Sequence, residues 1–233
     1  MQIKLRIIDK YVIWKTKANK HVVDLPSHTV DQNRYVWNSY DWSQKGEEWT
    51  RHATNPEEWK ADLLQNMMFR YLKPESIILE IGPGAGRWTE YLQKNAKHLI
   101  LVDIAPKCIE MCKERFAGHS NIEYHVLEDN IDFLHENSID FVWSYDVFVH
   151  VNPSDIDRYV ENIRRILKLG GTAVIHHSAA EYESEKIARK GFRAQMTAEK
   201  FADIVSRREM RLLEQNRELV HKKGDIISVF TKA

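Results

Sequence analysis

The chain has 233 residues, of which 43% are hydrophobic and 29% are charged, so it can bury one sizeable core and is neither disordered nor fibrous. Lysine plus arginine and aspartate plus glutamate each number 34 and cancel, which excludes the broad positive field of non-specific nucleic-acid or membrane-surface binding. Two cysteines are too few for a disulfide framework, and no apolar run approaches the roughly 20 residues that span a bilayer. We expect a cytoplasmic globular protein without a membrane span.

Tryptophan is concentrated near the N-terminus, before the regular part of the sequence begins. Five of the 7 tryptophans lie in the first quarter of the chain: Trp14, Trp37, Trp42, Trp49 and Trp59. From residue 56 onward, helix-like and strand-like segments alternate, whereas residues 1–55 lack this pattern. We therefore predict an N-terminal cap or lid segment over residues 1–55 and one main domain over residues 56–233.

The main domain is predicted to alternate helices and strands along the chain. It begins with a helix from Pro56 to near Pro74, because Asn55 and Pro56 are typical of a helix start. Residue patterns predict strands over 77–81, 98–103, 122–127, 139–144 and 172–176, and helices over 88–92, 106–116, 153–169 and 197–206. Residues 211–220 and 225–231 are predicted to form an antiparallel hairpin at the sheet edge. This order predicts an α/β fold with a mostly parallel sheet and helices on both faces.

A glycine-rich loop follows the first strand of the main domain, between Glu80 and Arg87. Glycines at alternate positions, namely Gly82, Gly84 and Gly86, let the backbone turn tightly and let a flat ligand lie directly against it. Arg87 stands where a dinucleotide-binding loop needs a third small residue. The Glu80 carboxylate would repel a phosphate but suits an ammonium group. The loop therefore favours a cationic ligand over a dinucleotide.

Polar residues lie at or just after the carboxyl ends of the next two strands. Asp103 closes the second strand, 21 residues after Gly82, where a carboxylate can accept hydrogen bonds from both ribose hydroxyls of an adenosine. Asp129 and Asn130 follow the third strand, where an acid or an amide can bind the adenine amino group, with Glu128 as an alternative to Asp129. Together with the loop, these residues predict a site for a nucleoside joined to a cationic amino acid.

With these motifs the chain resembles the class I S-adenosylmethionine-dependent methyltransferases over roughly residues 56–233. In that family the E-x-G-x-G-x-G stretch holds the methionine part of the cofactor, and acids after the second and third strands take the ribose and the adenine. Residues 166–171 match the family's turn before the fifth strand, with Leu169 where proline is usual. The resemblance implies a Rossmann-like sheet of seven strands, parallel except for the hairpin strand at its edge. The cofactor contacts that it implies are Glu80, Gly82, Pro83, Gly84, Gly86, Trp88, Asp103, Ile104, Asp129, Asn130 and Ser144.

Methyl transfer to a hydroxyl requires a base that removes the proton. Ligands of open α/β sheets lie beyond the carboxyl ends of the strands, so candidate bases are His150 after the fourth strand and His177 after the fifth, with Asp146 to orient a histidine. His176 and His177 are neighbours in a strand, so their rings should point to opposite faces. A histidine-rich site with Asp146 could also hold a divalent metal that lowers the pKa of a hydroxyl, but no residue spacing requires one. The remaining histidines are interpreted as surface or capping residues: His21, His28, His52, His98, His119, His125, His135 and His221.

The sequence lacks the motifs of methyltransferases that act on other classes of acceptor. Residues 144–147 lack the N/D-P-P-Y motif of enzymes that methylate amino groups in DNA, neither cysteine follows a proline as in cytosine-C5 enzymes, and the paired glutamates of protein arginine enzymes are missing. Residues 145–151, 174–178 and 191–197 instead resemble a bacterial subgroup that acts on small molecules and saccharides. We therefore expect a small-molecule or saccharide substrate and no nucleic acid, with Tyr145, His176 and Arg193 as candidate substrate contacts.

The preferred reaction is O-methylation of a small molecule or sugar unit. The alternatives are N-methylation of a small amine and a non-catalytic protein of the same fold that binds a partner through its aromatic N-terminus. Trp42 and Trp49 are candidates for a wall of the acceptor site, together with Tyr35, Trp37 and Tyr40. The alternative is that these rings are buried against the first helix near Trp59. No oligomeric state is predicted.

Overall fold

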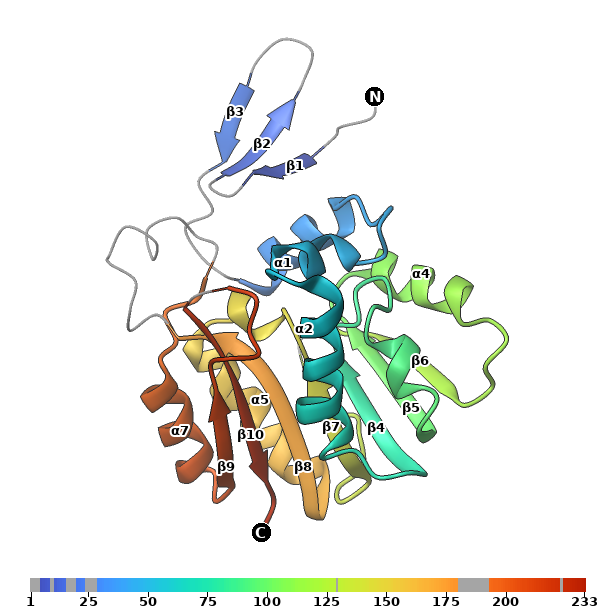
Figure 1. The fold of residues 1–233 in the computed structure, drawn as a ribbon, viewed down its shortest axis with the longest axis vertical. Helices are drawn as coiled ribbons and strands as arrows, with labels where there is room; N and C mark the ends of the chain where they lie inside the picture. Colours follow the sequence, from blue (N-terminus) through green and yellow to red (C-terminus); the bar gives the residue numbers. More distant parts are fainter. Residues whose placement is uncertain are drawn as a thin grey trace.

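The computed structural model describes residues 5–8, 11–15, 20–23, 29–128, 130–179, 193–222 and 224–233. A twisted sheet with helices on both faces dominates the fold (Figure 1). The elements are β1 (Leu5–Ile8), β2 (Tyr11–Lys15), β3 (Lys20–Val23), α1 (Val30–Ser39), η1 (Glu47–His52), α2 (Pro56–Leu63), η2 (Leu64–Phe69), β4 (Ser76–Ile81), α3 (Thr89–Leu92), β5 (Ala96–Asp103), α4 (Pro106–Arg115), β6 (Ile122–Val126), β7 (Ile139–Ser144), η3 (Phe148–His150), α5 (Pro153–Ile166), β8 (Leu167–Ser178), α7 (Ala198–Arg207), β9 (Arg211–Asn216) and β10 (Asp225–Thr231).

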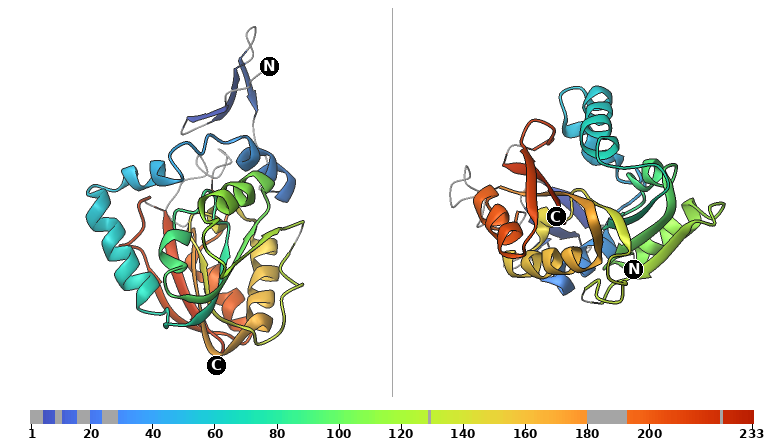
Figure 2. Two further views of the ribbon diagram at one scale, coloured as in Figure 1. Left: turned by 90° about the vertical axis from the view of Figure 1, so that its right-hand side faces the viewer. Right: turned by 90° about the horizontal axis from the view of Figure 1, so that it is seen from below.

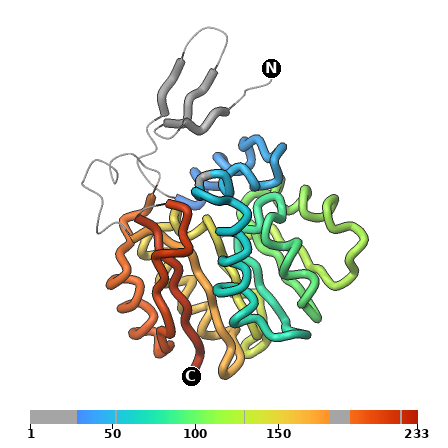
Figure 3. The backbone as a smooth tube through the Cα atoms, in the orientation of Figure 1, coloured from blue at the N-terminus to red at the C-terminus, as the bar shows by residue number. Residues whose placement is uncertain are grey.

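The main sheet has seven strands in the order β6-β5-β4-β7-β8-β10-β9. Neighbouring strands from β6 to β8 pair in parallel, and β10 is antiparallel to both β8 and β9. The predicted α/β class and mostly parallel sheet are therefore confirmed. The predicted antiparallel hairpin at the sheet edge is also confirmed, with β10 as the antiparallel strand and β9 as the outermost strand (Figure 3). Every residue of β10 is buried, whereas β9 is partly exposed and carries charged residues suited to an edge.

Each face of the sheet carries its own helices and its own core. On one face, Val160 of α5 and Phe201 of α7 pack with Ile81 and Val142 from the central strands. On the other face, α2, η2 and α4 pack with Trp143 and its neighbours in the sheet. Figure 2 shows helices on both sides of the sheet. The strands β4 and β7 can be buried on both faces because apolar residues predominate in them.

Several element boundaries differ from the sequence-based prediction, for example at the start of β8 and at the end of β9. Helix α5 ends at Ile166 and β8 begins at Leu167, so the two glycines that follow lie within the strand instead of before it. Strand β9 ends at Asn216 instead of residue 220, because the Asn216 side-chain oxygen accepts hydrogen bonds from the N–H groups of Glu218 and Leu219 at 3.0 and 2.9 Å. In such a turn the backbone no longer forms hydrogen bonds with the neighbouring strand.

The N-terminal region contains structure that the sequence patterns did not predict. Strands β1, β2 and β3 form a small antiparallel sheet. Residues 29–55, here called the cap segment, contain α1 and η1 and lie across one end of the main sheet (Figures 1 and 3). Thr29 begins α1 with a capping box, in which its hydroxyl accepts from the Gln32 N–H. Among the described residues, no helix has the length and apolar character needed to cross a membrane.

Candidate active site

The glycine-rich loop joins β4 to α3 at the carboxyl end of β4. Gly82, Gly84 and Gly86 have positive φ angles of 73°, 57° and 84°, a region that residues with a Cβ rarely adopt. A Cβ at Gly82 would lie 2.3 Å from Val147, and a Cβ at Gly84 would lie 2.8 Å from the ring of Trp42. The loop therefore needs glycine both for its turn and for the close approach of its neighbours.

Two buried acids flank this loop, as predicted from their positions at the ends of neighbouring strands. Glu80 is 1% exposed, and its Oε2 accepts a hydrogen bond from the Thr89 hydroxyl at 2.6 Å. Asp103 accepts from the Ala105 N–H through Oδ1 at 2.8 Å and from the Gly84 N–H through Oδ2 at 3.3 Å. Burial raises the pKa of Glu80 to about 8 and that of Asp103 to about 6. A cation brought to the loop would favour the ionised form of both acids.

Other predicted cofactor residues lie around the loop, in mainly structural contacts. The buried Ser144 hydroxyl donates to the carbonyl of Ile81 at 2.8 Å and ties β7 to β4. The carbonyl of Pro83 accepts from the Gly86 N–H at 2.9 Å and closes the turn. Trp88 is 3% exposed and forms part of the core beneath the loop.

The predicted adenine side of the site lies at the ends of β5 and β6. Ile104 follows β5, and its carbonyl accepts from Arg34 Nε at 3.1 Å. The Asn130 side-chain oxygen accepts from the N–H of Asp132 at 3.0 Å, so it forms a local turn. Asp129 lies outside the described residues. This edge of the site is therefore covered by an arginine of the cap segment.

Aromatic side chains of the cap segment gather above the glycine-rich loop. The ring of Tyr40 stacks on Trp49 with centroids 5.1 Å apart and meets Trp42 edge-on at 4.9 Å. We call this group the aromatic cluster; it also includes Trp37. It packs on Ala85 of the loop and on the start of α4. Trp59 lies outside this cluster and contacts Trp88 and Tyr145, while Lys60 of the same helix pairs with Glu47 of η1.

Polar contacts hold the cap segment to three parts of the main domain. Arg34 Nη2 donates to the carbonyl of Glu128 at 2.7 Å, in addition to its bond with Ile104. Asn33 Nδ2 donates to the carbonyl of His150 at 3.0 Å. Lys107 Nζ donates to the carbonyl of Tyr40 at 2.9 Å. The cap segment therefore bridges the ends of β5, β6 and β7.

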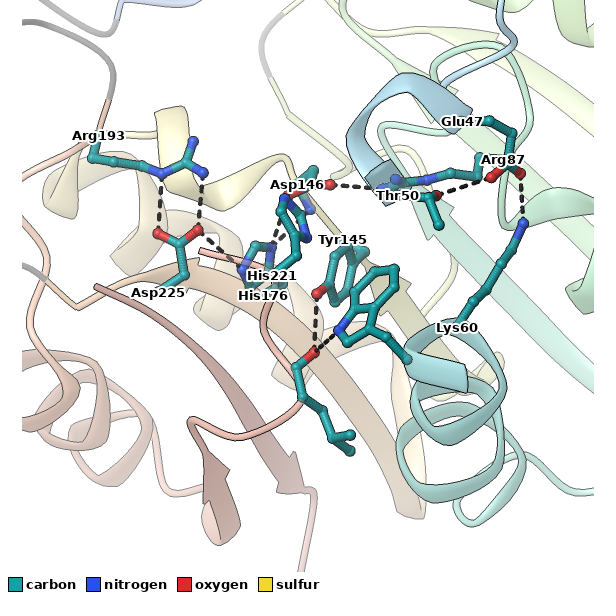
Figure 4. A network of polar contacts seen from close by, with 12 residues as sticks. Glu47, Thr50, Lys60, Arg87, Tyr145, Asp146, His176, Arg193, His221 and Asp225 are labelled. Atoms are coloured by element: carbon teal, nitrogen blue, oxygen red, sulfur yellow. Dashed lines mark hydrogen bonds and ion pairs between the residues drawn. The ribbon is translucent and has the colours of Figure 1, made fainter. Parts of the chain in front are cut away.

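A buried polar network lies beside the loop, centred on Asp146 (Figure 4). Asp146 has a positive φ of 63°, and its Oδ2 accepts from Arg87 Nη2 at 2.6 Å. Its Oδ1 lies 3.3 Å from His176 Nδ1 and 3.6 Å from His221 Nε2. Burial by itself raises the pKa of Asp146, but the nearby His221, His176 and Arg87 outweigh it and hold the pKa well below its usual range. Asp146 is therefore a carboxylate beside an arginine and two histidines.

The network continues from His176 into the C-terminal hairpin. His176 Nε2 lies 3.4 Å from Asp225 Oδ2, and the ring stacks on Tyr145 with centroids 4.2 Å apart. Burial opposes the charged imidazole, but Asp146 and Asp225 together raise the pKa of His176. Arg193 donates through Nε and Nη2 to both oxygens of Asp225, at 3.0 and 2.9 Å. Arg193, predicted as a substrate contact, is therefore bound to a carboxylate of the protein itself.

His221 belongs to this network, although the sequence indicated a surface or capping residue. Its side chain is 0% exposed, so that expectation is wrong. The loop after β9 folds inward because Trp59 Nε1 and the Tyr145 hydroxyl both donate to the carbonyl of Leu219, at 3.0 and 3.3 Å. Burial lowers the pKa of His221 to about 4. No local pattern around residue 221 signals this position, because the donors come from distant parts of the chain.

The two predicted bases lie in different surroundings. His150 ends η3, and its ring lies 5.3 Å from that of Trp37, at the contact between β7 and the cap segment. His177 is buried on the opposite face of β8, where it stacks on Phe201 at 3.9 Å and contacts the Ser228 hydroxyl at 2.8 Å. Burial lowers the pKa of His177 to about 3. His177 therefore packs in the core between β8 and α7, and only His150 remains as a candidate base.

The glycine-rich loop, the two buried acids and the aromatic cluster therefore lie together at the carboxyl ends of β4 and β5, beside a buried network of acids and histidines. Among the described residues, no group of three or more histidine, cysteine, aspartate or glutamate side chains is arranged to hold a metal ion.

Comparison with known proteins agrees with this arrangement. Residues 78–171 match a family model described as a methyltransferase domain. A structure described as a S-adenosylmethionine-dependent methyltransferase from Aquifex aeolicus superposes with a TM-score of 0.58 at 17% identity, covering 77% of this chain and 99% of that one. The family match covers the segment from β4 to the start of β8, and the solved structure shares the fold of this chain.

Curated relatives match over part of their length. A phosphoethanolamine N-methyltransferase from Plasmodium falciparum is 27% identical over 142 residues, which is 58% of this chain and 53% of the relative. A squalestatin hexaketide synthase from a Phoma species is 30% identical over 121 residues, which is 46% of this chain and 5% of the synthase. The chain thus spans about half of one relative and a small part of the other.

Proposed function

We propose that the chain transfers the methyl group of S-adenosylmethionine to a hydroxyl of a small molecule or sugar unit. The observation that carries this proposal is the arrangement around the glycine-rich loop, with buried Glu80 before it, Asp103 beside it and Trp42 closed over Gly84. The cofactor supplies an electrophilic methyl group on a positively charged sulfur. The protein must hold the acceptor in line with it.

The residues around the loop fit this cofactor. The Glu80 carboxyl group, with its pKa raised to about 8, would ionise when an ammonium group approaches it. Each oxygen of Asp103 accepts one backbone N–H, so the carboxylate keeps lone pairs for ribose hydroxyls. These residues bind and orient the cofactor and take no part in the displacement itself.

His150 is the proposed base for a hydroxyl acceptor. It follows β7 at the carboxyl end of the sheet, where the cap segment contacts its carbonyl. A neutral imidazole can take the proton of an attacking hydroxyl. Tyr145 and Trp49 flank the Arg87 guanidinium at 5.8 and 5.9 Å. We propose Tyr145, Trp49 and His176 as residues that shape the acceptor side of the site.

Cofactor binding is tested by calorimetry with S-adenosylmethionine and S-adenosylhomocysteine. We expect micromolar dissociation constants for both ligands, with a loss of about 10-fold or more for Asp103→Asn, because an amide accepts fewer hydrogen bonds than a carboxylate. Binding of neither ligand to the folded wild-type chain would remove the methyltransferase proposal.

The role of His150 is tested with methyl-transfer assays on His150→Ala between pH 6 and pH 9, using a panel of small hydroxyl acceptors. General base catalysis contributes about 100-fold or more, so kcat should fall by about that factor while cofactor affinity stays unchanged. Turnover near that of the wild type across this range would exclude His150 as the base and leave the cofactor assignment intact.

A small amine is the second candidate acceptor. The similarity to phosphoethanolamine N-methyltransferases favours it. An amine that is already neutral needs no strong base, so His150→Ala would then retain most of its activity at a pH above the pKa of the acceptor. Mass spectrometry of products from paired hydroxyl and amine acceptors distinguishes the two reactions.

A further inference from the structure

Arg87 directly follows the last glycine of the loop, and its guanidinium is nearly excluded from water. Its side chain is 5% exposed. The guanidinium carbon lies 4.5 Å from the centroid of the Trp88 ring, and Trp49 and Tyr145 lie within 6 Å of it on other sides. Gly46 of the cap segment approaches its Cβ. The positive charge of Arg87 therefore lies among aromatic rings, between the loop and the cap segment.

The two amino groups of this guanidinium differ in their partners. Nη2 donates to Asp146 Oδ2 at 2.6 Å. Nη1 is buried, and no described residue accepts a hydrogen bond from it. A buried charged donor without an acceptor is costly and rare in folded proteins. The position of Nη1 therefore calls for an oxygen acceptor that comes from a ligand.

The charges around the loop indicate which ligand group this is. Glu80 precedes the three glycines with a carboxyl group, and Arg87 follows them with a guanidinium, close enough for Arg87 to lower the pKa of Glu80. An acid on one side and an arginine on the other complement the two charges of an amino-acid zwitterion. Arginine is also well suited to carboxylates, which its planar array of donors matches.

We propose that Arg87 binds the carboxylate of the cofactor's methionine half through Nη1 while Nη2 keeps its bond to Asp146. The inference rests on the proposed use of S-adenosylmethionine and adds a residue to its binding site. A consequence is that one side chain contacts the cofactor, Asp146 and the cap segment together.

The test compares two ligands that differ only in the carboxylate: S-adenosylhomocysteine and its decarboxylated analogue. Calorimetry gives both dissociation constants for the wild type and for Arg87→Lys, which keeps a positive charge beside Asp146 but loses the second planar donor. We expect Arg87→Lys to weaken S-adenosylhomocysteine binding by about 10-fold or more and to change binding of the decarboxylated analogue by less than about 2-fold.

Arg115→Lys is the matched control. Arg115 contacts the same loop, since its Nη1 donates to the carbonyl of Ala85 at 2.9 Å, but its Nη2 is already bound to Glu90. The Arg115 variant should therefore not change the ratio of the two dissociation constants. Equal weakening of both ligands by Arg87→Lys, or no weakening of either, would overturn the role of Arg87. If the wild type binds neither ligand, the proposed function itself fails.

Discussion

The fold favours the protonated form of Glu80, whereas the proposed binding of an ammonium group requires its ionised form. Its carboxyl group is buried and hydrogen-bonded to Thr89, and burial raises its pKa from 4.5 to about 8. A raised pKa in an acid means that the folded state binds the proton more tightly than the unfolded state. The stability that this proton provides is complete below about pH 4.5 and is lost as pH rises through about 8.

Glu80→Gln should therefore stabilise the cofactor-free protein at alkaline pH and weaken cofactor binding. Gln cannot ionise, so at pH 9 the gain should be on the order of 2 to 4 kcal/mol, and it should disappear near pH 4.5. Thermal unfolding between pH 5 and pH 9 measures the stability, and calorimetry with S-adenosylmethionine measures the affinity.

Glu136→Gln, at an exposed position, is the control for this experiment and should leave both quantities unchanged. A Glu80→Gln variant that is less stable than the wild type at pH 9 would contradict the burial argument. One with unchanged cofactor affinity would contradict the assignment of Glu80 to the ammonium group.

At the scale of single residues, the sequence located the proposed site residues that follow a strand, and it did not locate a buried residue whose position depends on distant contacts. Glu80, Asp103 and Asp146 could be found because each lies at a strand end in a parallel sheet, where ligands bind. His221 could not, because its burial depends on hydrogen bonds from Trp59 and Tyr145 to the loop that carries it. Local sequence patterns do not predict such contacts between distant residues.

At the scale of elements, periodicity located most helices and strands, and the packing of the cap segment had to come from the structure. The Trp-rich composition indicated an added segment, but composition is equally compatible with a lid over the site and with simple burial. The aromatic cluster packs on Ala85 and on the start of α4, so the segment covers the glycine-rich loop. This contact leads to two predictions.

Gly84→Ala should separate the loop from the cap segment. The new Cβ would lie 2.8 Å from the Trp42 ring, and the backbone φ of 57° is strained for alanine, at a cost of about 1 to 2 kcal/mol for the conformation alone. We expect a lower melting temperature, a shift in tryptophan fluorescence and cofactor affinity reduced by about 10-fold.

Gly118→Ala is the matched control, because nothing lies within 4 Å of a Cβ placed there. It should be neutral or slightly stabilising. If both variants behave alike in fluorescence and affinity, the contact between Gly84 and Trp42 has no part in the site.

Arg34→Met should loosen the cap segment without touching the glycine-rich loop. Arg34 donates to the carbonyls of Ile104 and Glu128 at the ends of β5 and β6, and each hydrogen bond from a charged group contributes about 1.5 to 3 kcal/mol. We expect S-adenosylhomocysteine to dissociate about 10-fold faster or more, measured by stopped-flow fluorescence. Arg158→Met, at an exposed ion pair on α5, is the control. An unchanged dissociation rate would show that the cap segment does not retain the ligand.

At the scale of the whole molecule, one charge network joins parts of the chain that are far apart in sequence. Arg87 comes from the glycine-rich loop, Asp146 from the end of β7, His176 from β8, and Asp225 from β10. The alternation of helices and strands predicted a mostly parallel sheet, because such strands are joined by right-handed crossovers, and the family resemblance implied seven strands. The network was not predictable, because it depends on which faces of β8 and β10 meet across an antiparallel pair.

The two adjacent histidines of β8 should respond to pH with opposite signs. His176 has its pKa raised above 6.5 because Asp146 and Asp225 outweigh the cost of burial, whereas burial lowers the pKa of His177 to about 3. The contribution of protonated His176 to stability is complete below about pH 6.5 and is lost as pH rises through the folded-state pKa. Neutral His177 contributes above about pH 6.5, and its contribution is lost as pH falls toward 3.

Thermal unfolding of His176→Gln and His177→Gln from pH 5 to pH 9 tests this difference. The loss of stability relative to the wild type, about 1 to 3 kcal/mol for a buried hydrogen-bonded group, should be largest at acidic pH for His176→Gln and shrink as pH rises. For His177→Gln it should be largest at alkaline pH and shrink as pH falls. Because both side chains are fully buried, exposure alone would give both variants the same trend. Parallel pH profiles would therefore show that the carboxylates of Asp146 and Asp225 do not hold a proton on His176.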